Sequence, residues 1–182
     1  MILCAGKNEA FDFAKPIGIG LIESAITLTH YVIEYKPAFL FFVGTAGSYG
    51  KYQPFDLLYS HHASNIELGF LNNSCYTPIM HSIEAEKKYV PRETLHSFAT
   101  VNSSNYITTS SELASEMLKR GLELENMDFF SVVTVANHFH LTCLGMFVVT
   151  NYCNEHAHND FIANHEKSKE IIRLHVEKNL KI

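Results

Sequence analysis

Blocks of apolar residues alternate with polar or glycine-containing turns along the whole chain. The short apolar run at residues 2–6 predicts a strand. The nearly continuous run at residues 39–47 predicts a strand buried on both faces, as in a sheet covered by helices on two sides. Further strands are predicted at residues 56–60, 96–103 and 141–151.

Helical spacing of apolar residues appears between these runs. Residues 16–36 begin with two glycines and then follow a helical period, which Pro37 ends. The Thr-Ser-Ser-Glu sequence at residues 109–112 indicates a capping box ahead of a short helix that ends at Gly121. The other helices are predicted at residues 126–140 and, with Lys and Glu on the wet face, at residues 160–180.

This alternation of strands and helices predicts an α/β fold. We expect three layers, with a mainly parallel mixed sheet flanked by helices, in a single domain over residues 1–182. Ligands in such folds bind at the carboxyl ends of the strands. Four segments that carry glycines or short polar side chains should therefore converge on one site: residues 6–9, 44–47, 103–107 and 150–154.

Composition narrows the class of partner. The 182 residues carry a net charge of −5 with only 14 Lys and Arg, which argues against nucleic-acid binding. The four cysteines are isolated, as in a reducing compartment. The N-terminus lacks a basic region, and no run approaches the roughly 18 apolar residues of a membrane span. We expect a cytoplasmic protein that binds no membrane.

The 11 histidines raise the question of a metal site. Pairs with one intervening residue, such as His138 and His140, can place both rings on one face of a strand and bind zinc. No His-Glu-x-x-His motif or Cys/His framework accompanies the pairs. We therefore expect no metal, with the histidines solvated or satisfied within the core.

Several motifs occur in a fixed order along the chain. They are GIG (18–20), KP (36–37), GTAG (44–47), DLLYSHHA (56–63), VNSSNYITTS (101–110), ENMDFF (125–130) and MFVVTNYCN (146–154). In this order and strand context the set resembles the nucleoside phosphorylase family of type I. That family includes purine nucleoside phosphorylases and the methylthioadenosine/S-adenosylhomocysteine nucleosidases. The resemblance implies a site that binds a purine nucleoside and breaks its N-glycosidic bond.

The resemblance assigns base and ribose contacts. Tyr106 matches the aromatic residue that stacks on the purine, and Ile107 matches a residue whose backbone bonds the base edge. Met127 and Asp128 match a Met-Glu pair whose carboxylate holds the ribose hydroxyls. Without the resemblance, Tyr106 and Ile107 would pass as core residues, and Asp128 as an acidic residue in the first turn of a helix.

Two possible nucleophiles follow from the resemblance. Glu9 matches the glutamate that activates water in the nucleosidases, although it could be a plain surface carboxylate. Thr45 matches the Ser or Thr that contacts phosphate in the phosphorylases. With Lys7 and the amides of Gly18 to Gly20 at a helix N-terminus, it would form a phosphate site.

Two departures from the family pattern bear on the reaction. Asn154 stands where the family has its catalytic aspartate, although Thr150 and Asn151 also match the strand end of the trimeric phosphorylases. An amide at either position favours 6-oxopurines. An arginine of the hexameric phosphorylases is replaced by Phe42, and the three arginines of the chain are Arg92, Arg120 and Arg173. Few arginine side chains are therefore available to bind phosphate through two hydrogen bonds.

These observations leave three hypotheses. The leading one is a purine nucleoside phosphorylase with inorganic phosphate as co-substrate and no other cofactor. The second is a nucleosidase in which Glu9 activates water. The third is a purine- or nucleoside-binding relative without activity. Because subunits of the family complete each other's sites, we also expect a homo-oligomer, most simply a dimer.

Overall fold

The computed structural model describes residues 1–89 and 97–180. Its strands are β1 (Ile2–Cys4), β2 (Lys15–Pro16), β3 (Phe39–Ser48), β4 (Leu57–Ser64), β5 (Ser82–Glu84), β6 (Lys87–Lys88), β7 (Phe98–Asn102), β8 (Leu124–Glu125) and β9 (Thr142–Tyr152). Its helices are the short 3-10 helix η1 (Lys7–Glu9), α1 (Leu21–Tyr35), α2 (Leu68–Leu71), α3 (Ser111–Lys119), α4 (Phe129–His138) and α5 (Ala157–Leu180). None of the helices in these ranges is long and apolar enough to cross a membrane.

All the strands belong to one mixed sheet. The hydrogen-bonded order is β2-β1-β3-β8-β7-β4-β9-β6, with β5 beside β4, and β3 also pairs directly with β9. The second pairing of β3 closes a circuit through β8, β7, β4 and β9, so the middle of the sheet curls into a barrel. The long pair β3–β9 is parallel, and antiparallel pairs join β4 to β9 and β3 to β8. The predicted α/β class with a mainly parallel mixed sheet is confirmed.

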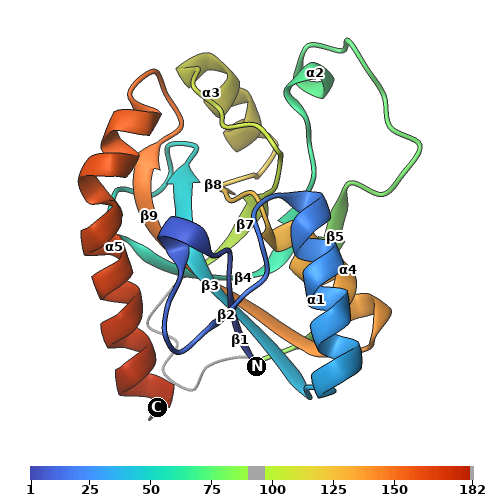
Figure 1. Ribbon diagram of the computed structural model, residues 1–182. Helices are drawn as coiled ribbons and strands as arrows, with labels where there is room; N and C mark the ends of the chain where they lie inside the picture. The colour runs from blue at the N-terminus through green and yellow to red at the C-terminus, as the bar shows by residue number, and fades with distance from the viewer. Residues whose placement is uncertain (90–96, 181–182) are drawn as a thin grey trace.

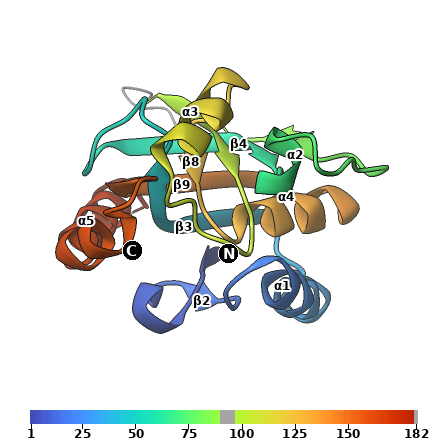
Figure 2. The same ribbon diagram turned by 90° about the horizontal axis from the view of Figure 1, so that it is seen from above.

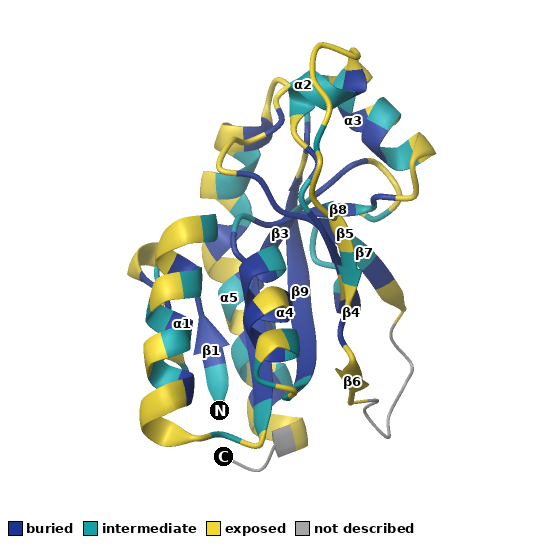
Figure 3. Cartoon of the chain, turned by 90° about the vertical axis from the view of Figure 1, so that its right-hand side faces the viewer, coloured by how far each residue is buried: buried dark blue, intermediate teal, exposed yellow. Residues whose placement is uncertain are grey.

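Helices cover the sheet on two sides. In Figures 1 and 2, α5 lies along one side, while α1 and α4 lie on the other. Burial follows this layering, since β3 and β9 are buried along nearly their whole length and the outer faces of the helices are exposed (Figure 3). The nearly continuous apolar runs of the sequence correspond to these doubly covered strands.

The centre of the core is an aromatic cluster. Phe42 on β3, Phe129 on α4 and Phe147 on β9 are fully buried, with ring centroids 5.1–6.1 Å apart. Gly145 makes room for this cluster, because a Cβ there would lie 2.6 Å from the Phe129 ring. Phe42, which occupies the position of the missing arginine, is thus a core residue.

The first helix begins and ends as predicted. Gly20 precedes α1 with a φ of 84°, a left-handed conformation that favours glycine, and Lys36 ends the helix just before Pro37. The apolar residues of α1 do not all face inward. Leu28 and Val32 are buried, whereas the predicted apolar positions Ile22, Ile26 and Ile33 are 58–71% exposed.

Several predicted boundaries need correction. The N-cap of α3 is Ser110, whose hydroxyl accepts a hydrogen bond from the amide of Leu113, so the helix starts one residue later than the predicted capping box implies. The predicted helix at 126–140 begins only at Phe129, because Asn126 forms a turn ahead of it. Residue 96 of the predicted strand 96–103 lies outside the described residues. The short elements η1, β2, α2, β5, β6 and β8 were not predicted.

Candidate active site

A cavity of about 460 Å³ opens at the carboxyl ends of the central strands. All four predicted segments contribute to it, through residues 6–9, 45–47, Ile107 and 150–151. The remaining lining comes from Ile19 ahead of α1, Thr109 ahead of α3, the ends of β1 and β8, the start of α4 and the first two turns of α5. The convergence predicted from the strand-end rule is therefore confirmed for these segments.

Glu9 reaches this cavity from η1, which follows a left-handed glycine at position 6. Its carboxylate accepts hydrogen bonds from both the amide (3.3 Å) and the hydroxyl of Thr45. The Glu9 side chain is only 15% exposed. Burial raises the pKa of Glu9 to about 7; the Thr45 hydrogen bonds oppose this shift and the charge of Asp128 adds to it. Glu9 is thus a largely buried carboxyl group that ionises near neutral pH.

Asp128 is the second buried carboxylate of the cavity. Its Oδ1 accepts hydrogen bonds from the amide of Gly20 at 2.6 Å and from the hydroxyl of Ser24 at 3.3 Å. Burial raises the pKa of Asp128 to about 6, against the effect of these two donors. Among the described residues no donor bonds to Oδ2, which leaves that oxygen available to a ligand.

Asn126 sets the position of this carboxylate. Its Oδ1 accepts hydrogen bonds from the amides of Asp128 and Phe129, which caps the start of α4. Its Nδ2 donates to the carbonyl of Thr45. The same side chain therefore ties the β3 end that carries Thr45 to the turn that carries Met127 and Asp128, both of which line the cavity.

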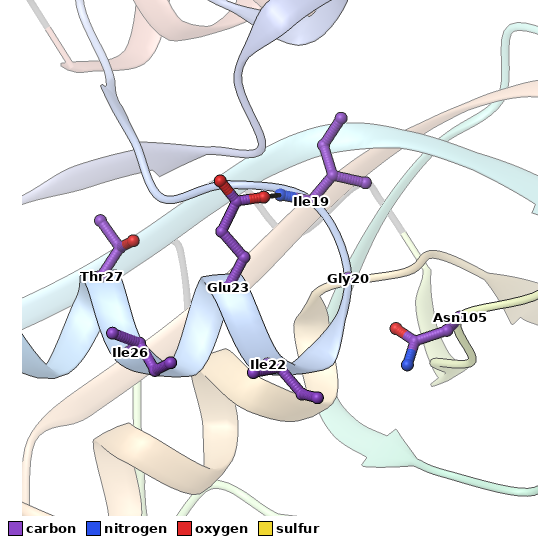
Figure 4. Close-up of a pocket in the computed structure, with 7 residues that line it drawn as sticks. All are labelled: Ile19, Gly20, Ile22, Glu23, Ile26, Thr27 and Asn105. Carbon is purple, nitrogen blue, oxygen red and sulfur yellow. Dashed lines mark hydrogen bonds between the residues drawn. The ribbon is translucent and has the colours of Figure 1, made fainter.

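The amides at the start of α1 are already bonded to groups of the protein. Ile19 donates to the carboxylate of Glu23 (Figure 4), Gly20 to Asp128, and Leu21 to the side chain of Asn105. The amide of Gly18 donates to the carbonyl of residue 5. The predicted phosphate site is thus brought together only in part, since Lys7, Ile19 and Thr45 line the cavity whereas Gly18 and Gly20 do not.

The described arginines lie away from this cavity. Arg120 follows α3 and bonds Glu116, and Arg173 on α5 lies beside Glu170. Arg92 lies outside the described residues. Neither Arg120 nor Arg173 lines the cavity, so neither offers a bidentate contact to an anion there.

The two asparagines near the end of β9 have different surroundings. Asn151 lines the cavity and is 6% exposed; its Oδ1 accepts from Thr150 at 2.7 Å, and its Nδ2 donates to the carbonyl of Tyr152. Asn154 lies outside the lining, where its Oδ1 accepts from the amide of His156 in the turn before α5. The structure brings Asn151, and not Asn154, to the cavity.

Of the two predicted base-binding residues, only one lines the cavity. Ile107 lines the cavity and is 57% exposed. Tyr106 is 72% exposed and does not belong to the lining. The ring predicted to stack on the purine therefore lies on the surface, and its stacking role stays a prediction.

Several residues of the site escaped prediction. Glu125 is buried and accepts hydrogen bonds from the amide and hydroxyl of Thr108 and from the hydroxyl of Tyr49. On α5, His158 and Phe161 line the cavity. His158 and Phe161 are three residues apart, and this i, i+3 spacing, which places both on one face of α5, is the signal that could have indicated them.

This arrangement suits general base chemistry beside a developing cation. A carboxyl with a pKa near 7 is an efficient base at neutral pH. A second fixed carboxylate stabilises positive charge in a transition state more than in a neutral ground state. The buried amide of Asn151 adds a hydrogen-bond donor for a leaving group.

Comparison with known proteins gives a consistent picture. The family model described as "Phosphorylase superfamily" matches residues 13–180. Among curated protein sequences, none matches the chain. Solved structures do match: a futalosine hydrolase mutant of Helicobacter pylori has a TM-score of 0.74 and 16% identity over 97% of both chains.

Two nucleosidases are similar as well. The 5'-methylthioadenosine/S-adenosyl homocysteine nucleosidase of Helicobacter pylori has a TM-score of 0.71 and 18% identity, covering 90% of this chain and 78% of that one. The S-adenosylhomocysteine nucleosidase of Streptococcus pyogenes has a TM-score of 0.67 and 11% identity, covering 86% and 74%. At these identities the likeness shows a shared fold.

Proposed function

The chain belongs to the phosphorylase superfamily, and on that premise we propose that it hydrolyses the N-glycosidic bond of a purine nucleoside, with Glu9 as the base that activates water. The observation that carries this proposal is the pairing of Glu9 with Thr45. The amide and the hydroxyl that would bind phosphate both donate to the carboxylate of Glu9. The position expected for a phosphate ion is thus held by a general base.

The surroundings of the pair support water rather than phosphate as nucleophile. The amides at the start of α1 are bonded to carboxylate, amide and carbonyl oxygens of the chain itself. The carboxylates of Glu9 and Asp128 line the same cavity and would repel a phosphate dianion. The similar structures include a futalosine hydrolase and nucleosidases, which are hydrolytic by name. Hydrolysis therefore replaces phosphorolysis as the leading hypothesis.

The proposed reaction assigns a step to each group. Glu9 takes a proton from water while the water oxygen attacks the anomeric carbon. The bond between that carbon and the purine nitrogen breaks, and its electron pair leaves with the base, which then takes up a proton from solvent. Asp128 holds the ribose hydroxyls through Oδ2 and stabilises the positive charge on the sugar. The Nδ2 amide of Asn151 donates to the departing purine, which favours a 6-oxopurine.

Product analysis with and without phosphate tests the proposal. The purified protein is incubated in phosphate-free buffer with inosine, guanosine, adenosine, methylthioadenosine and futalosine. We expect free base and a free sugar at a rate that added phosphate does not change. A phosphorylated sugar and a rate proportional to phosphate would establish phosphorolysis instead. Tight binding of a purine without turnover on any substrate would favour a binding protein.

A Glu9→Gln variant tests the assigned base. The amide cannot accept the water proton, so kcat should fall by roughly 10²- to 10⁴-fold with little change in KM. Glu112→Gln is the matched control, because Glu112 is an exposed residue in the first turn of α3 and lies outside the cavity. Full activity of Glu9→Gln would remove Glu9 from the mechanism.

We also propose that the protein is a homo-oligomer. The exposed side chains of Ile22 and Ile26 on α1 line a shallow hollow with Asn105, next to the exposed Tyr106 (Figure 4 shows the first three). An apolar surface of this kind is typical of a subunit contact. Light scattering of the wild type and of Ile26→Glu tests it. We expect a dimer that the variant splits, and a monomeric wild type would refute the proposal.

A further inference from the structure

His165 is a buried histidine that the proposed reaction leaves unused. It lies on α5, its side chain is 8% exposed, and its ring contacts that of Phe161 at 4.6 Å between centroids. Its Nε2 has no hydrogen-bond partner among the described residues. A buried polar atom without a partner is destabilising, so its retention calls for a reason.

The unpartnered nitrogen faces Glu9. His165 Nε2 lies 3.8 Å from Glu9 Oε1, slightly beyond hydrogen-bond distance. The other ring nitrogen, Nδ1, lies 3.5 Å from the carboxylate of Glu166, whose side chain is 86% exposed. The imidazole therefore stands between the buried carboxylate of the cavity and a carboxylate at the surface.

We propose that His165 is the proton acceptor behind Glu9, so that the two residues hold the proton of the attacking water as a pair. This inference rests on the proposed hydrolysis. The tautomer with the proton on Nδ1 suits the role, because Nδ1–H then faces Glu166 and the Nε2 lone pair faces Glu9. A small closure of the 3.8 Å gap on substrate binding would complete the hydrogen bond.

The proton balance of this step is simple. Glu9 takes one proton from water, whose oxygen bonds to the anomeric carbon, and passes it to His165 Nε2. Glu9 is then anionic while positive charge is present on the sugar, which stabilises that charge. The imidazolium lies between two carboxylates. The purine, which leaves with the electron pair of the broken bond, takes up one proton from solvent. After the products leave, the proton on Nε2 returns through Glu9 to the water that refills the cavity, so that one water molecule is consumed overall and the starting forms are restored.

Charged groups around the pair set its protonation. From α5, Glu166 raises the pKa of His165, while Lys169 and, above all, burial lower it. Lys169 also bonds the carbonyl of Asn8 beside Glu9. From the other elements, Asp128 and the buried thiol of Cys4 lie near enough to Glu9 to interact with its charge. Burial thus favours the neutral histidine before catalysis. The positive charge that develops on the sugar lowers the pKa of Glu9 during the reaction, which favours transfer of the proton to Nε2.

Kinetics of His165→Gln test the proposal against a purely structural role. We expect kcat to fall by about tenfold or more with KM unchanged, and the acid limb of the kcat–pH profile to change from two ionisations to one. His140→Gln is the matched control, because His140 is exposed and pairs with Glu86 away from the cavity. A variant with wild-type kcat and an unchanged acid limb would overturn the proposal.

A second variant covers the case in which His165→Gln folds poorly. Glu166→Gln changes only an exposed side chain. Removing its charge should lower the pKa of His165 and shift the acid limb of kcat to lower pH. An acid limb identical to that of the wild type would count against the pair.

A third measurement is independent of turnover and separates failure of the pair from failure of the proposed function. The titration of the His165 ring is followed by NMR in the wild type and in Glu9→Gln. If the two groups interact, loss of the Glu9 charge lowers the His165 midpoint by roughly half a pH unit or more. An unmoved His165 midpoint overturns the pair, whether or not the wild type hydrolyses a nucleoside.

Discussion

The amide of Gly20 donates a 2.6 Å hydrogen bond to Oδ1 of Asp128, joining two residues 108 positions apart in the sequence. The bond places a carboxylate at the N-terminus of α1, where the helix dipole stabilises negative charge. It also fixes one oxygen of Asp128, so that only the other is left for a ligand. The helix N-terminus thus positions a side chain of the chain itself.

Replacing Asp128 should separate its charge from its hydrogen bonds. In Asp128→Asn the Oδ1 can still accept from Gly20 and Ser24, so we expect the fold to be retained. The negative charge beside the sugar is lost, and kcat/KM should fall by roughly 10- to 100-fold. Steady-state kinetics with circular dichroism as a folding control measure both. Unchanged kcat/KM would exclude Asp128 from the ribose site.

The raised pKa of Glu9 predicts how stability depends on pH. The pKa rises from its ordinary value of 4.5 to about 7 on folding. Below pH 4.5 both the folded and unfolded states hold the proton, and the stability is fully present. Between pH 4.5 and 7 the unfolded state ionises first, so the free energy of unfolding decreases by about 3 kcal/mol. Above pH 7 the loss is constant.

Glu9→Gln removes this dependence, because the amide does not ionise. The variant should match the wild type near pH 4.5 and exceed it by about 3 kcal/mol at pH 8, as measured by urea unfolding at both pH values. The raised pKa of Asp128 acts in the same direction and is present in both proteins. An equal difference at the two pH values would show that Glu9 is not buried as a neutral acid.

Thr45→Val tests whether Thr45 serves Glu9 or a phosphate ion. The hydroxyl bonds the ionised form of Glu9 and lowers its pKa, so its removal should raise that pKa above 7. We expect the acid limb of kcat to move to higher pH by roughly one unit. A phosphate-binding threonine would give a different result, namely an unchanged acid limb and a KM for phosphate that increases in the variant.

The fold was largely predictable from the sequence, because the two long central strands are buried on both faces and therefore form apolar runs. The meeting of four strand ends was predictable from chain topology alone. The partners within the site were not. Glu9 and Thr45 are 36 residues apart, and the pairing of their side chains is decided by tertiary packing. A motif can identify Thr45 as a phosphate ligand, but it cannot show that a carboxylate is already bonded there.

The sequence also could not show which of the two asparagines near the end of β9 faces the cavity. Both Asn151 and Asn154 match family motifs, and spacing gave no reason to prefer either. The strand ends at Tyr152, so Asn151 still belongs to the sheet and faces the cavity, whereas Asn154 has entered the turn before α5. A strand end is among the least certain features of a sequence-based prediction, and here it decides which side chain meets the ligand.

Alanine variants of Asn151 and Asn154 should affect different properties, namely kcat for the first and the free energy of unfolding for the second. Asn151→Ala removes the amide that faces the cavity, so kcat should fall on the order of 10²-fold if that amide stabilises the departing purine. Asn154→Ala removes an acceptor for the amide of His156, which should lower the free energy of unfolding by about 1 kcal/mol and leave kcat near that of the wild type. Base release and urea unfolding of both variants measure the two effects. The reverse pattern, a large loss of kcat in Asn154→Ala alone, would mean that the turn before α5 rearranges when substrate binds and that Asn154 contacts the base.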